Sequence, residues 1–296
     1  MTNRHFGRIS EVWKHIVLAE VLRAEQPRVV LDTHAGDALY PLVEDPERQF
    51  GVLGFNQVLD QESELQHSAY ATVLYSLRTK ASLVGIPGGP LVAMAVLGDR
   101  AEYLFCDLDQ RSAKNVREVA THRGLHSARV LAADGMESVH HELARHDPTT
   151  VVVFIDPFDH HVVGSVGLSA LDVAVQAAHA GAVLVYWYGY NRVDQRAWIL
   201  HQLVERDAAP TLWCGDLMVI AEGEDMSTGD LGVASSPGTG SGLVCANISP
   251  ATAERCTALG IALAATYRNR HLPSGSAGAL DFLAIYHRAA PAGTAP

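Results

Sequence analysis

Short apolar segments with the composition of buried strands alternate with longer segments of helical periodicity through the middle of the chain. This alternation constrains the fold more than any other feature of the sequence. The strand-like segments are residues 28–32, 102–107, 128–132, 150–155 and 182–188, and the helical ones are residues 10–22, 110–123, 135–145, 168–179 and 194–206. The pattern predicts a doubly wound α/β fold, in which helices cover both faces of a mostly parallel sheet.

The beginning and the end of the chain depart from this alternation. No strand follows the polar helical residues 57–80 directly, so we expect residues 44–80 to form a helical insertion after the first strand. Late in the chain, strand-like segments follow one another closely, with one helix among them at residues 251–268, which predicts an antiparallel finish to the sheet. These late strands are expected at residues 211–221, 242–248 and 280–287.

The composition is that of an ordinary globular protein. Apolar residues make up 48% of the chain and charged residues 19%, so we expect one domain over residues 1–296, with a mobile loop at 222–241 and a flexible tail at 289–296. No segment is apolar enough to span a bilayer, and residues 1–10 lack the apolar run of a secretion signal. We therefore expect a cytoplasmic protein without a membrane partner. The net charge of −11 opposes an approach to RNA.

Polar residues, most of them acidic, stand where several of the predicted strands end. Because the carboxyl ends of parallel strands meet at one edge of a sheet, where ligands bind, we expect these side chains to gather there. Any one acid alone is better explained as a helix N-cap or a loop residue, but the set together favours a ligand rich in hydrogen-bond donors. The residues of this edge are Asp32, His34, Asp107, Asp109, Asp134 and Asp156.

The turn after the first strand contains one glycine, Gly36, and lacks the GxGxxG pattern of dinucleotide-binding folds. Phosphate binding is therefore not indicated. S-adenosylmethionine carries no phosphate, and one glycine that lets the backbone approach the ligand suffices for it. We therefore predict S-adenosylmethionine as the cofactor and S-adenosylhomocysteine as the product.

Six short motifs occur in one order along the chain. They are VWKH at residues 12–15, LDTHAG at 31–36, IPGGPL at 86–91, ADG at 133–135, IDP at 155–157 and GSG at 240–242. In this order, over about residues 5–250, the chain resembles the RlmJ-type bacterial large-subunit (23S) rRNA adenine methyltransferases. LDTHAG with an upstream Lys-His is the most specific part. The resemblance implies a class I, Rossmann-like methyltransferase fold and methyl transfer to an adenine exocyclic amine.

The resemblance also carries roles to individual residues. Asp156 falls on the catalytic acid of the family. His5 and Lys14 match its N-terminal segment, which closes over the site, but a solvated chain end explains His5 equally well and a solvated helix face explains Lys14 somewhat better. His15, His34, Asp107 and Asp134 fall on family positions that contact the cofactor. With the other residues of the strand ends, the predicted cofactor-binding set is His15, Asp32, His34, Gly36, Gly89, Asp107, Asp134, Gly135 and Asp156.

The sequence departs from the family pattern at four places. The catalytic motif reads Asp156-Pro157-Phe158-Asp159 instead of Asp-Pro-Pro-aromatic, and Asp159 can neither stack on a base nor attract a phosphate. Gly89 replaces a side chain that helps to hold the cofactor, and the start of the chain lacks the aromatic residue that meets the RNA base. The late loop, basic in the family, contains Glu222, Glu224, Asp225 and Asp230. All four changes point away from RNA and leave the cofactor site largely intact.

Several residues near Asp156 are candidates for the acceptor side of the site. Asp156 is expected to accept a hydrogen bond from the acceptor, and His160 or His161 to act as a base, although a polar loop explains the two histidines more simply. Trp187 and Tyr188 either line an acceptor pocket or belong to a packed aromatic cluster. Because adjacent residues in extended chain point in opposite directions, we expect no metal here. The predicted catalytic set is Asp156, His160, His161 and Lys14, and the substrate-binding set is His5, Pro157, Phe158, Asp159, Trp187 and Tyr188.

The sequence therefore predicts an S-adenosylmethionine-dependent methyltransferase that methylates a small molecule, in natural product biosynthesis. The acidic charge and the altered catalytic motif decide this choice of acceptor. The first alternative is a 23S rRNA adenine methyltransferase, and the second is a non-catalytic protein that binds the cofactor.

Overall fold

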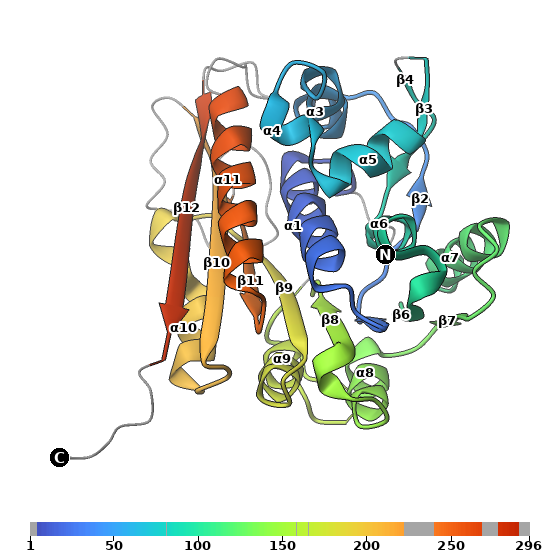
Figure 1. Cartoon of the computed structure of the whole chain (residues 1–296), viewed down its shortest axis with the longest axis vertical. Helices are drawn as coiled ribbons and strands as arrows, with labels where there is room; N and C mark the ends of the chain where they lie inside the picture. The colour runs from blue at the N-terminus through green and yellow to red at the C-terminus, as the bar shows by residue number, and fades with distance from the viewer. Residues whose placement is uncertain are drawn as a thin grey trace.

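The computed structural model describes residues 5–80, 82–157, 159–164, 166–221, 240–267 and 278–289. In these ranges, strands and helices alternate through the middle of the chain as predicted (Figure 1). The strands of the central sheet are β1 Val29–Asp32, β6 Glu102–Cys106, β7 Ala128–Leu131, β8 Val151–Ile155, β9 Val183–Tyr190, β10 Thr211–Ala221, β11 Gly240–Ala246 and β12 Gly278–Arg288.

Within the described ranges these strands form one eight-stranded sheet in the order β12-β10-β11-β9-β8-β1-β6-β7. The strands from β9 to β7 in that order pair in parallel, whereas β11 is antiparallel to both its neighbours and β12 is antiparallel to β10. The prediction of a mostly parallel sheet with antiparallel C-terminal strands is therefore confirmed. The order reverses at β1, which lies between β8 and β6, and doubly wound sheets bind ligands at such a reversal.

The register of the parallel strands brings their carboxyl ends level. Asp32, the last residue of β1, lies opposite Phe105 of β6 and Phe154 of β8. The segments that follow these strands therefore leave the sheet along one edge. We call this edge the rim and define it by Asp32, His34, Asp107, Asp109, Asp134 and Asp156.

Helices cover both faces of the sheet, because alternate strand residues point to opposite faces and both sets are apolar. One buried cluster joins the sheet to four helices and to the short helices of the insertion, and the other joins it to three helices. The first face packs against α1 Ile9–Glu25, α6 Gly89–Leu97, α7 Gln110–His122 and α11 Pro250–Thr266. The second face packs against α8 Gly135–Leu143, α9 Ala170–His179 and α10 Trp198–Glu205.

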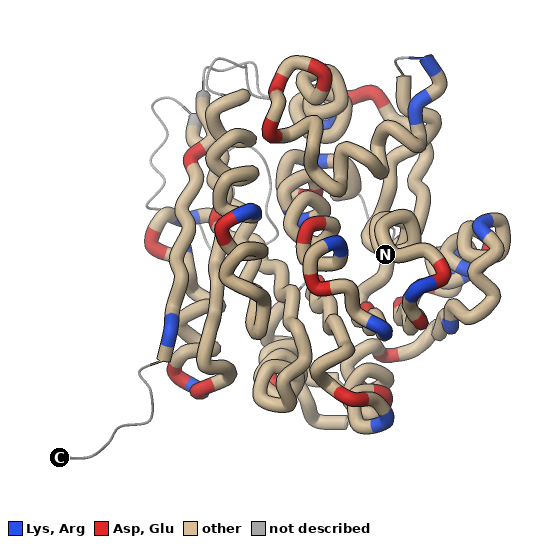
Figure 2. The backbone as a smooth tube through the Cα atoms, viewed as in Figure 1, with Lys and Arg blue, Asp and Glu red and all other residues tan. Residues whose placement is uncertain are grey.

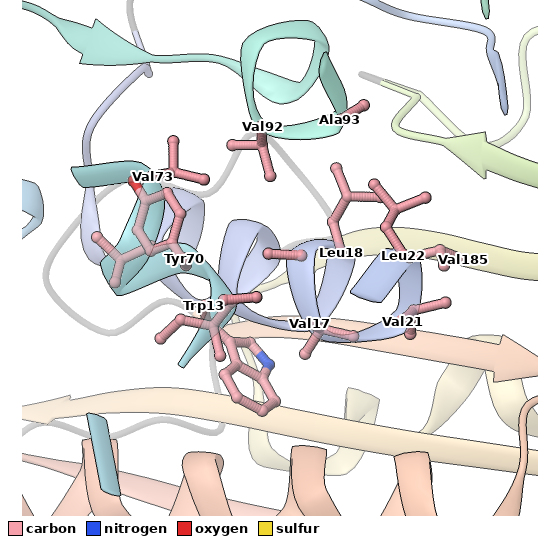
Figure 3. Packing of buried hydrophobic residues seen from close by; sticks show 14 of the residues in the cluster. Trp13, Val17, Leu18, Val21, Leu22, Tyr70, Val73, Val92, Ala93 and Val185 are labelled. Atoms are coloured by element: carbon pink, nitrogen blue, oxygen red, sulfur yellow. The ribbon is translucent and has the colours of Figure 1, made fainter. Parts of the chain in front are cut away.

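Helix α1 is buried on almost every side within the first cluster, and its buried residues include Glu11, Lys14 and Glu20 beside the apolar ones. Figure 3 shows Val17, Leu18 and Leu22 of this helix beside side chains of α6 and β9. Fully burying one such Val or Leu side chain contributes about 1.5–3 kcal/mol. The indole N–H of Trp13 donates to the carbonyl of Gly215 at 3.1 Å, which fixes the rotation of α1 against β10. That rotation decides which α1 side chains face the rim.

The predicted insertion consists of short helices and a small hairpin, and its helices within residues 46–58 and 69–76 pack against α1. These elements are α2 Pro46–Phe50, α3 Val52–Val58, α4 Ser63–Gln66, α5 Ala69–Ser76, β3 Arg78–Thr79 and β4 Ser82–Leu83. A two-stranded pair, β2 Leu39–Tyr40 with β5 Ile86–Pro87, joins the insertion to the rest of the chain. The buried carboxylate of Glu20 on α1 accepts the N–H of Ala69 at 2.8 Å and so caps α5.

Two predicted segments differ in detail from the structure. The helix predicted at residues 194–206 begins only at Trp198, because a 3-10 turn at Val193–Gln195 and a left-handed Ala197 (φ 58°) precede it. The predicted loop at 222–241 ends two residues earlier, since Gly240 and Ser241 already belong to β11. Residues 222–239 of that loop and residues 290–296 of the predicted tail lie outside the described residues.

Among the helices of the described residues, none is long and apolar enough to cross a membrane. Basic and acidic residues are interspersed over most of the molecule (Figure 2), although α7 contains Arg111, Lys114 and Arg117 and one acid, Glu118.

Candidate active site

Asp32 begins the rim and is almost completely buried (2% exposed). Its Oδ1 accepts the backbone N–H of His34 at 3.1 Å, which closes the turn after β1. Burial raises the pKa of the Asp32 carboxyl well above its usual value. The hydrogen bond from His34 lowers this pKa, whereas the negative charges of Asp156 and Asp107 raise it further. Asp32 therefore stabilises the turn after β1 by accepting the hydrogen bond from His34, and its raised pKa favours the neutral, protonated form.

Asp107 joins the turn after β1 to the turn after β6. One carboxylate oxygen accepts the N–H of Gly36 at 2.8 Å, and the other accepts the N–H of Asp109 at 2.7 Å. Gly36 has a φ of 61°, a left-handed conformation that glycine adopts without strain. Because both of its bonds go to main-chain donors, Asp107 fixes the backbone path of two turns at once.

Asp109 and Asp134 are N-caps, as the simpler explanation of each had it. Asp109 accepts the N–H of Arg111 at 2.9 Å at the start of α7, and Asp134 accepts the N–H of Met136 at 2.8 Å at the start of α8. Gly135 allows α8 to start against the turn after β1, because a Cβ there would come within 2.0 Å of the carbonyl oxygen of Thr33. Although both acids cap helices, they still belong to the rim, and their carboxylates are only partly buried.

The two histidines predicted to contact the cofactor lie in different surroundings. His34 is at the rim, where its Nδ1 is 2.8 Å from the Thr33 hydroxyl. Burial lowers its pKa, although nearby carboxylates, Asp156 first among them, act against this. His15 lies on α1 with its ring 5.6 Å from that of Tyr70 on α5, and burial lowers its pKa well below the usual range. Both rings are therefore neutral near pH 7.

Gly89, at the start of α6, lies beside Asp32. A Cβ at this position would stand 3.3 Å from the Phe154 ring and 3.6 Å from Oδ2 of Asp32. No side chain therefore stands between the start of α6 and the buried carboxyl of Asp32.

Lys14 connects α1 to Asp156, which follows β8. Its ammonium is 2.5 Å from Oδ2 of Asp156 and 2.7 Å from Oε1 of Glu11, and the lysine is 3% exposed. Burial would lower the pKa of Lys14, but the charges and hydrogen bonds of the two carboxylates outweigh it and raise the pKa. Lys14 is therefore a permanently charged, buried residue of the site, and the explanation of a solvated helix face does not hold.

The N-terminal segment lies against the insertion and the turn after β1. The ring of Phe6 stacks on Tyr40 with a centroid distance of 4.5 Å, and the guanidinium of Arg48 lies 4.4 Å from the centroid of the Phe6 ring. His5 is partly buried, and burial together with the charge of Arg8 lowers its pKa. These contacts of Phe6 hold the N-terminal segment in place.

The aromatic residues of β9 separate onto the two faces of the sheet. The indole N–H of Trp187 donates to the Ser241 hydroxyl at 2.8 Å on the face that carries α1. The hydroxyl of Tyr188 donates to the buried carboxylate of Asp216 at 2.7 Å on the opposite face. Of the two, the structure brings only Trp187 to Lys14, whose ammonium lies 5.5 Å from the centroid of its ring.

His160 packs into an aromatic cluster below the loop that carries Asp156. Its Nδ1 is 3.1 Å from the hydroxyl of Tyr186, and the ring of Trp198 lies 5.6 Å away. Burial lowers the pKa of His160 to about 4, with a contribution from His161. A ring so anchored and so weakly basic holds the loop in place, which fits the polar-loop explanation better than a base.

The other residues of this loop are less enclosed. Asp159 is exposed, and its Oδ1 accepts the N–H of His161 at 2.9 Å. His161 is exposed with its ring 5.7 Å from Trp198. Pro157 is buried beside Asp156. Phe158, predicted to bind the substrate, lies outside the described residues.

Two residues of the site were not predicted from the sequence. Glu11 shares the ammonium of Lys14, and Tyr186 anchors His160. An acid three residues before a lysine on a predicted helix could have indicated Glu11, because positions i and i+3 are neighbours on a helix. Tyr186 had no such signal.

The residues of the rim suit a nucleoside that carries donors and no phosphate. Carboxylates of Asp107 and Asp134 lie at the ends of neighbouring strands, and the exposed side chain of Leu108 (78% exposed) offers an apolar surface next to them. These groups match hydroxyl and amine donors and an aromatic base, as S-adenosylmethionine has. In the described part of the chain no group of three or more His, Cys, Asp and Glu residues could hold a metal ion.

Comparisons with known proteins place these features in a family. The family model described as "Ribosomal RNA large subunit methyltransferase D, RlmJ" matches residues 25–246. Protein LPL1258 from Legionella pneumophila, which carries the family label DUF519, has a similar structure, with a TM-score of 0.68, 17% identity, and a match over 94% of this chain and 97% of that chain. A SAM-dependent methyltransferase from Agrobacterium tumefaciens matches at a TM-score of 0.39 and 16% identity, over 79% of this chain and 60% of that one.

None of the curated proteins matches the chain. The fold is the class I, Rossmann-like methyltransferase fold, with the antiparallel C-terminal strands and the helical insertion that the sequence predicted.

Proposed function

The chain belongs to the RlmJ family of ribosomal RNA large-subunit methyltransferases, and on this premise we propose that it methylates an adenine exocyclic amine of large-subunit rRNA. Membership makes it an S-adenosylmethionine-dependent methyltransferase. The acceptor is the proposed part. The observation that carries it is the extent of the family match, which runs from before β1 to the end of β11 and includes the whole rim and Asp156.

The small-molecule acceptor predicted from the sequence, and with it a role in natural product biosynthesis, has no support in the comparisons. The family description names ribosomal RNA, which was the first alternative. The net charge weighed against RNA in that prediction because it sums over the whole surface. A folded protein needs only a local surface for a phosphate backbone, so the sum is a weak guide.

The bound cofactor supplies a methyl group that its sulfonium charge already makes electrophilic, so the residues of this chain mainly have to place the acceptor. Asp107, Asp134 and the main chain at Gly36 would hold the cofactor at the rim. Oδ1 of Asp156 would accept an N–H of the adenine amine and turn its lone pair toward the methyl group. The methylated amine then loses one proton, which the same carboxylate can accept.

A direct test uses an unmodified transcript of 23S rRNA and S-adenosylmethionine labelled in the methyl group. We expect label in the RNA and, after digestion to nucleosides, in N6-methyladenosine. The Asp156→Asn protein should leave the RNA unlabelled. The acceptor proposal is wrong if wild-type protein that binds the cofactor in calorimetry labels neither this transcript nor native subunits from cells lacking the enzyme.

One observation favours a second candidate, a small-molecule acceptor. Asp159, the last residue of the catalytic motif, is exposed, and a carboxylate there repels phosphate. The same labelled cofactor can be used with a cell extract as the source of the acceptor. The small-molecule candidate predicts that ribonuclease treatment of this extract leaves methyl transfer intact. The rRNA candidate predicts that it abolishes methyl transfer.

A further inference from the structure

The buried charge at the centre of the site is shared between two carboxylates. The Lys14 ammonium donates to Glu11 on its own helix and to Asp156 from β8, 142 positions away. Glu11 is 8% exposed and Lys14 3%. A surface ion pair of this kind would contribute little, but one held away from water acts at short range with weak screening.

Two N–H groups of Lys14 donate to the carboxylates, and the ammonium also lies 5.5 Å from the centroid of the Trp187 ring. Because Lys14 is buried and held by both carboxylates, its effect on an acceptor is expected to pass through Asp156. Among the described residues, the hydrogen bonds of the Asp156 side chain involve only Oδ2.

Glu11 matters to Asp156 because the two compete for the same cation. If Glu11 were neutral, the ammonium would be drawn to Asp156 alone, and that carboxylate would become a weaker acceptor for hydrogen bonds. With both carboxylates charged, the three side chains together carry a net charge of −1.

We propose that Glu11 is a positioning residue of the methyl-transfer reaction, which withholds part of the Lys14 charge from Asp156 so that Oδ1 of Asp156 stays a strong acceptor for the amine. The proposal rests on the proposed function for its reaction, but the sharing of Lys14 can be tested without any methyl transfer.

Other charged and titratable groups face this cluster from the elements packed around it. The charge of Arg8 lowers the pKa of Glu11. Burial is the main cause that raises the pKa of both nearby tyrosines, and the charge of Glu11 raises it further. These neighbours are Arg8, Tyr40 and Tyr70. Around Asp156 stand Asp32, His34, His160 and Tyr186.

The first experiment measures unfolding in urea for Glu11→Gln, Asp156→Asn and the double variant of the full chain. Each single variant leaves Lys14 one charged carboxylate, whereas the double variant leaves a buried ammonium with none. We expect the urea midpoint of the double variant to fall by clearly more than the sum of the two single changes. Additive changes would show that the two acids do not share Lys14 and would overturn the proposal.

The second experiment measures kcat of wild type and Glu11→Gln with the 23S rRNA transcript between pH 5 and 9. Burial raises the pKa of Glu11, opposed by Lys14 and supported by Asp156, so the wild type loses this charge on acidification earlier than an ordinary glutamate would. We expect Glu11→Gln to be about tenfold slower at pH 8, with an unchanged KM for S-adenosylmethionine, and the ratio to approach one as the pH falls. A ratio that does not change with pH contradicts the proposal.

Two further variants separate charge from packing. Glu11→Asp keeps the charge and should stay closer to wild type than to Glu11→Gln at pH 8. Glu20→Gln removes another buried glutamate of α1 that caps α5, and it should lower stability without a pH-dependent change in kcat. If the wild type labels no RNA while the urea coupling is present, the proposed acceptor is wrong and the sharing of Lys14 stands.

Discussion

The two sides of the candidate site are held together in different ways. On the cofactor side, the carboxylates of Asp107, Asp109 and Asp134 accept main-chain N–H groups of the turns after β1, β6 and β7. On the acceptor side, side chains contact other side chains, as Lys14 does with Asp156 and His160 with Tyr186. The first arrangement depends on local turns, and the second on how distant elements pack.

This difference fits the position of the altered catalytic motif, whereas the departure at Gly89 lies on the cofactor side. A turn held by main-chain bonds needs only an acid in the right place, so the cofactor side can stay the same while the rest of the chain changes. A side-chain network can be rebuilt residue by residue, and the altered Asp156-Pro157-Phe158-Asp159 motif lies on that side. We therefore expect substitutions on one side to affect cofactor binding and substitutions on the other to affect methyl transfer.

The largest effect is expected for Asp156→Asn. The sequence placed Asp156 in both the catalytic set and the cofactor-binding set, so this variant tests to which side of the site the residue belongs. Loss of the carboxylate that accepts the amine should lower kcat by about 10³-fold, while calorimetry should give a Kd for S-adenosylmethionine within about twofold of wild type. A parallel loss of cofactor binding would place Asp156 on the cofactor side and break the comparison.

Asp107→Ala should show the opposite pattern. It removes two charge-assisted bonds that fix the turns at Gly36 and Asp109, and each such bond is worth about 1.5–3 kcal/mol. We expect calorimetry to show a Kd for S-adenosylmethionine about 10- to 100-fold weaker, with little change in the KM for the acceptor. Asp109→Ala is the matched control, because it removes the cap of α7 and an exposed ion pair with Arg111 but no bond to the turn at Gly36, and it should cost about 1 kcal/mol of stability.

A smaller effect is expected for His160→Asn, which tests whether His160 anchors the loop or acts as a base. Since burial lowers its pKa to about 4, the ring is neutral above about pH 5. The variant should be several-fold slower by the same factor from pH 5.5 to 8, and His161→Asn should be unchanged. A loss for His160→Asn that varies with pH in this window would restore His160 as a base and blur the contrast between the two sides.

The smallest expected effect is a change in the pH dependence of stability when the buried His15 is replaced. Burial lowers the pKa of His15 well below its ordinary value of 6.5, so below about pH 6.5 the unfolded chain binds a proton that the folded chain does not. This histidine therefore destabilises the fold as the pH falls, by at most about 1.4 kcal/mol per pH unit. Urea midpoints at pH 7.5 and 5.5 should fall less for His15→Gln than for wild type. Equal pH dependence in both proteins would mean that His15 is protonated in the folded state.

Much of the cofactor side could be predicted from the sequence. Asp32, Asp107 and Asp134 follow strands, and residues at the ends of parallel strands meet whatever the details of packing. The N-cap role of Asp109 and Asp134 was also foreseen, since an acid before a helical segment is a local signal. The acceptor side was predicted as a set of residues without their contacts, and it included Tyr188, which the structure places on the face opposite Trp187.

By itself, then, the amino-acid order determined the alternation of strands and helices, the parallel sheet, the late antiparallel strands and the gathering of acids at one edge. Each of these depends on periodicity and end signals within a few residues. The tertiary structure alone decided that Lys14 is buried between Glu11 and Asp156 and that His160 lies under Tyr186. Those contacts depend on the rotation of α1 and on the packing of segments far apart in the chain, and no local pattern records either.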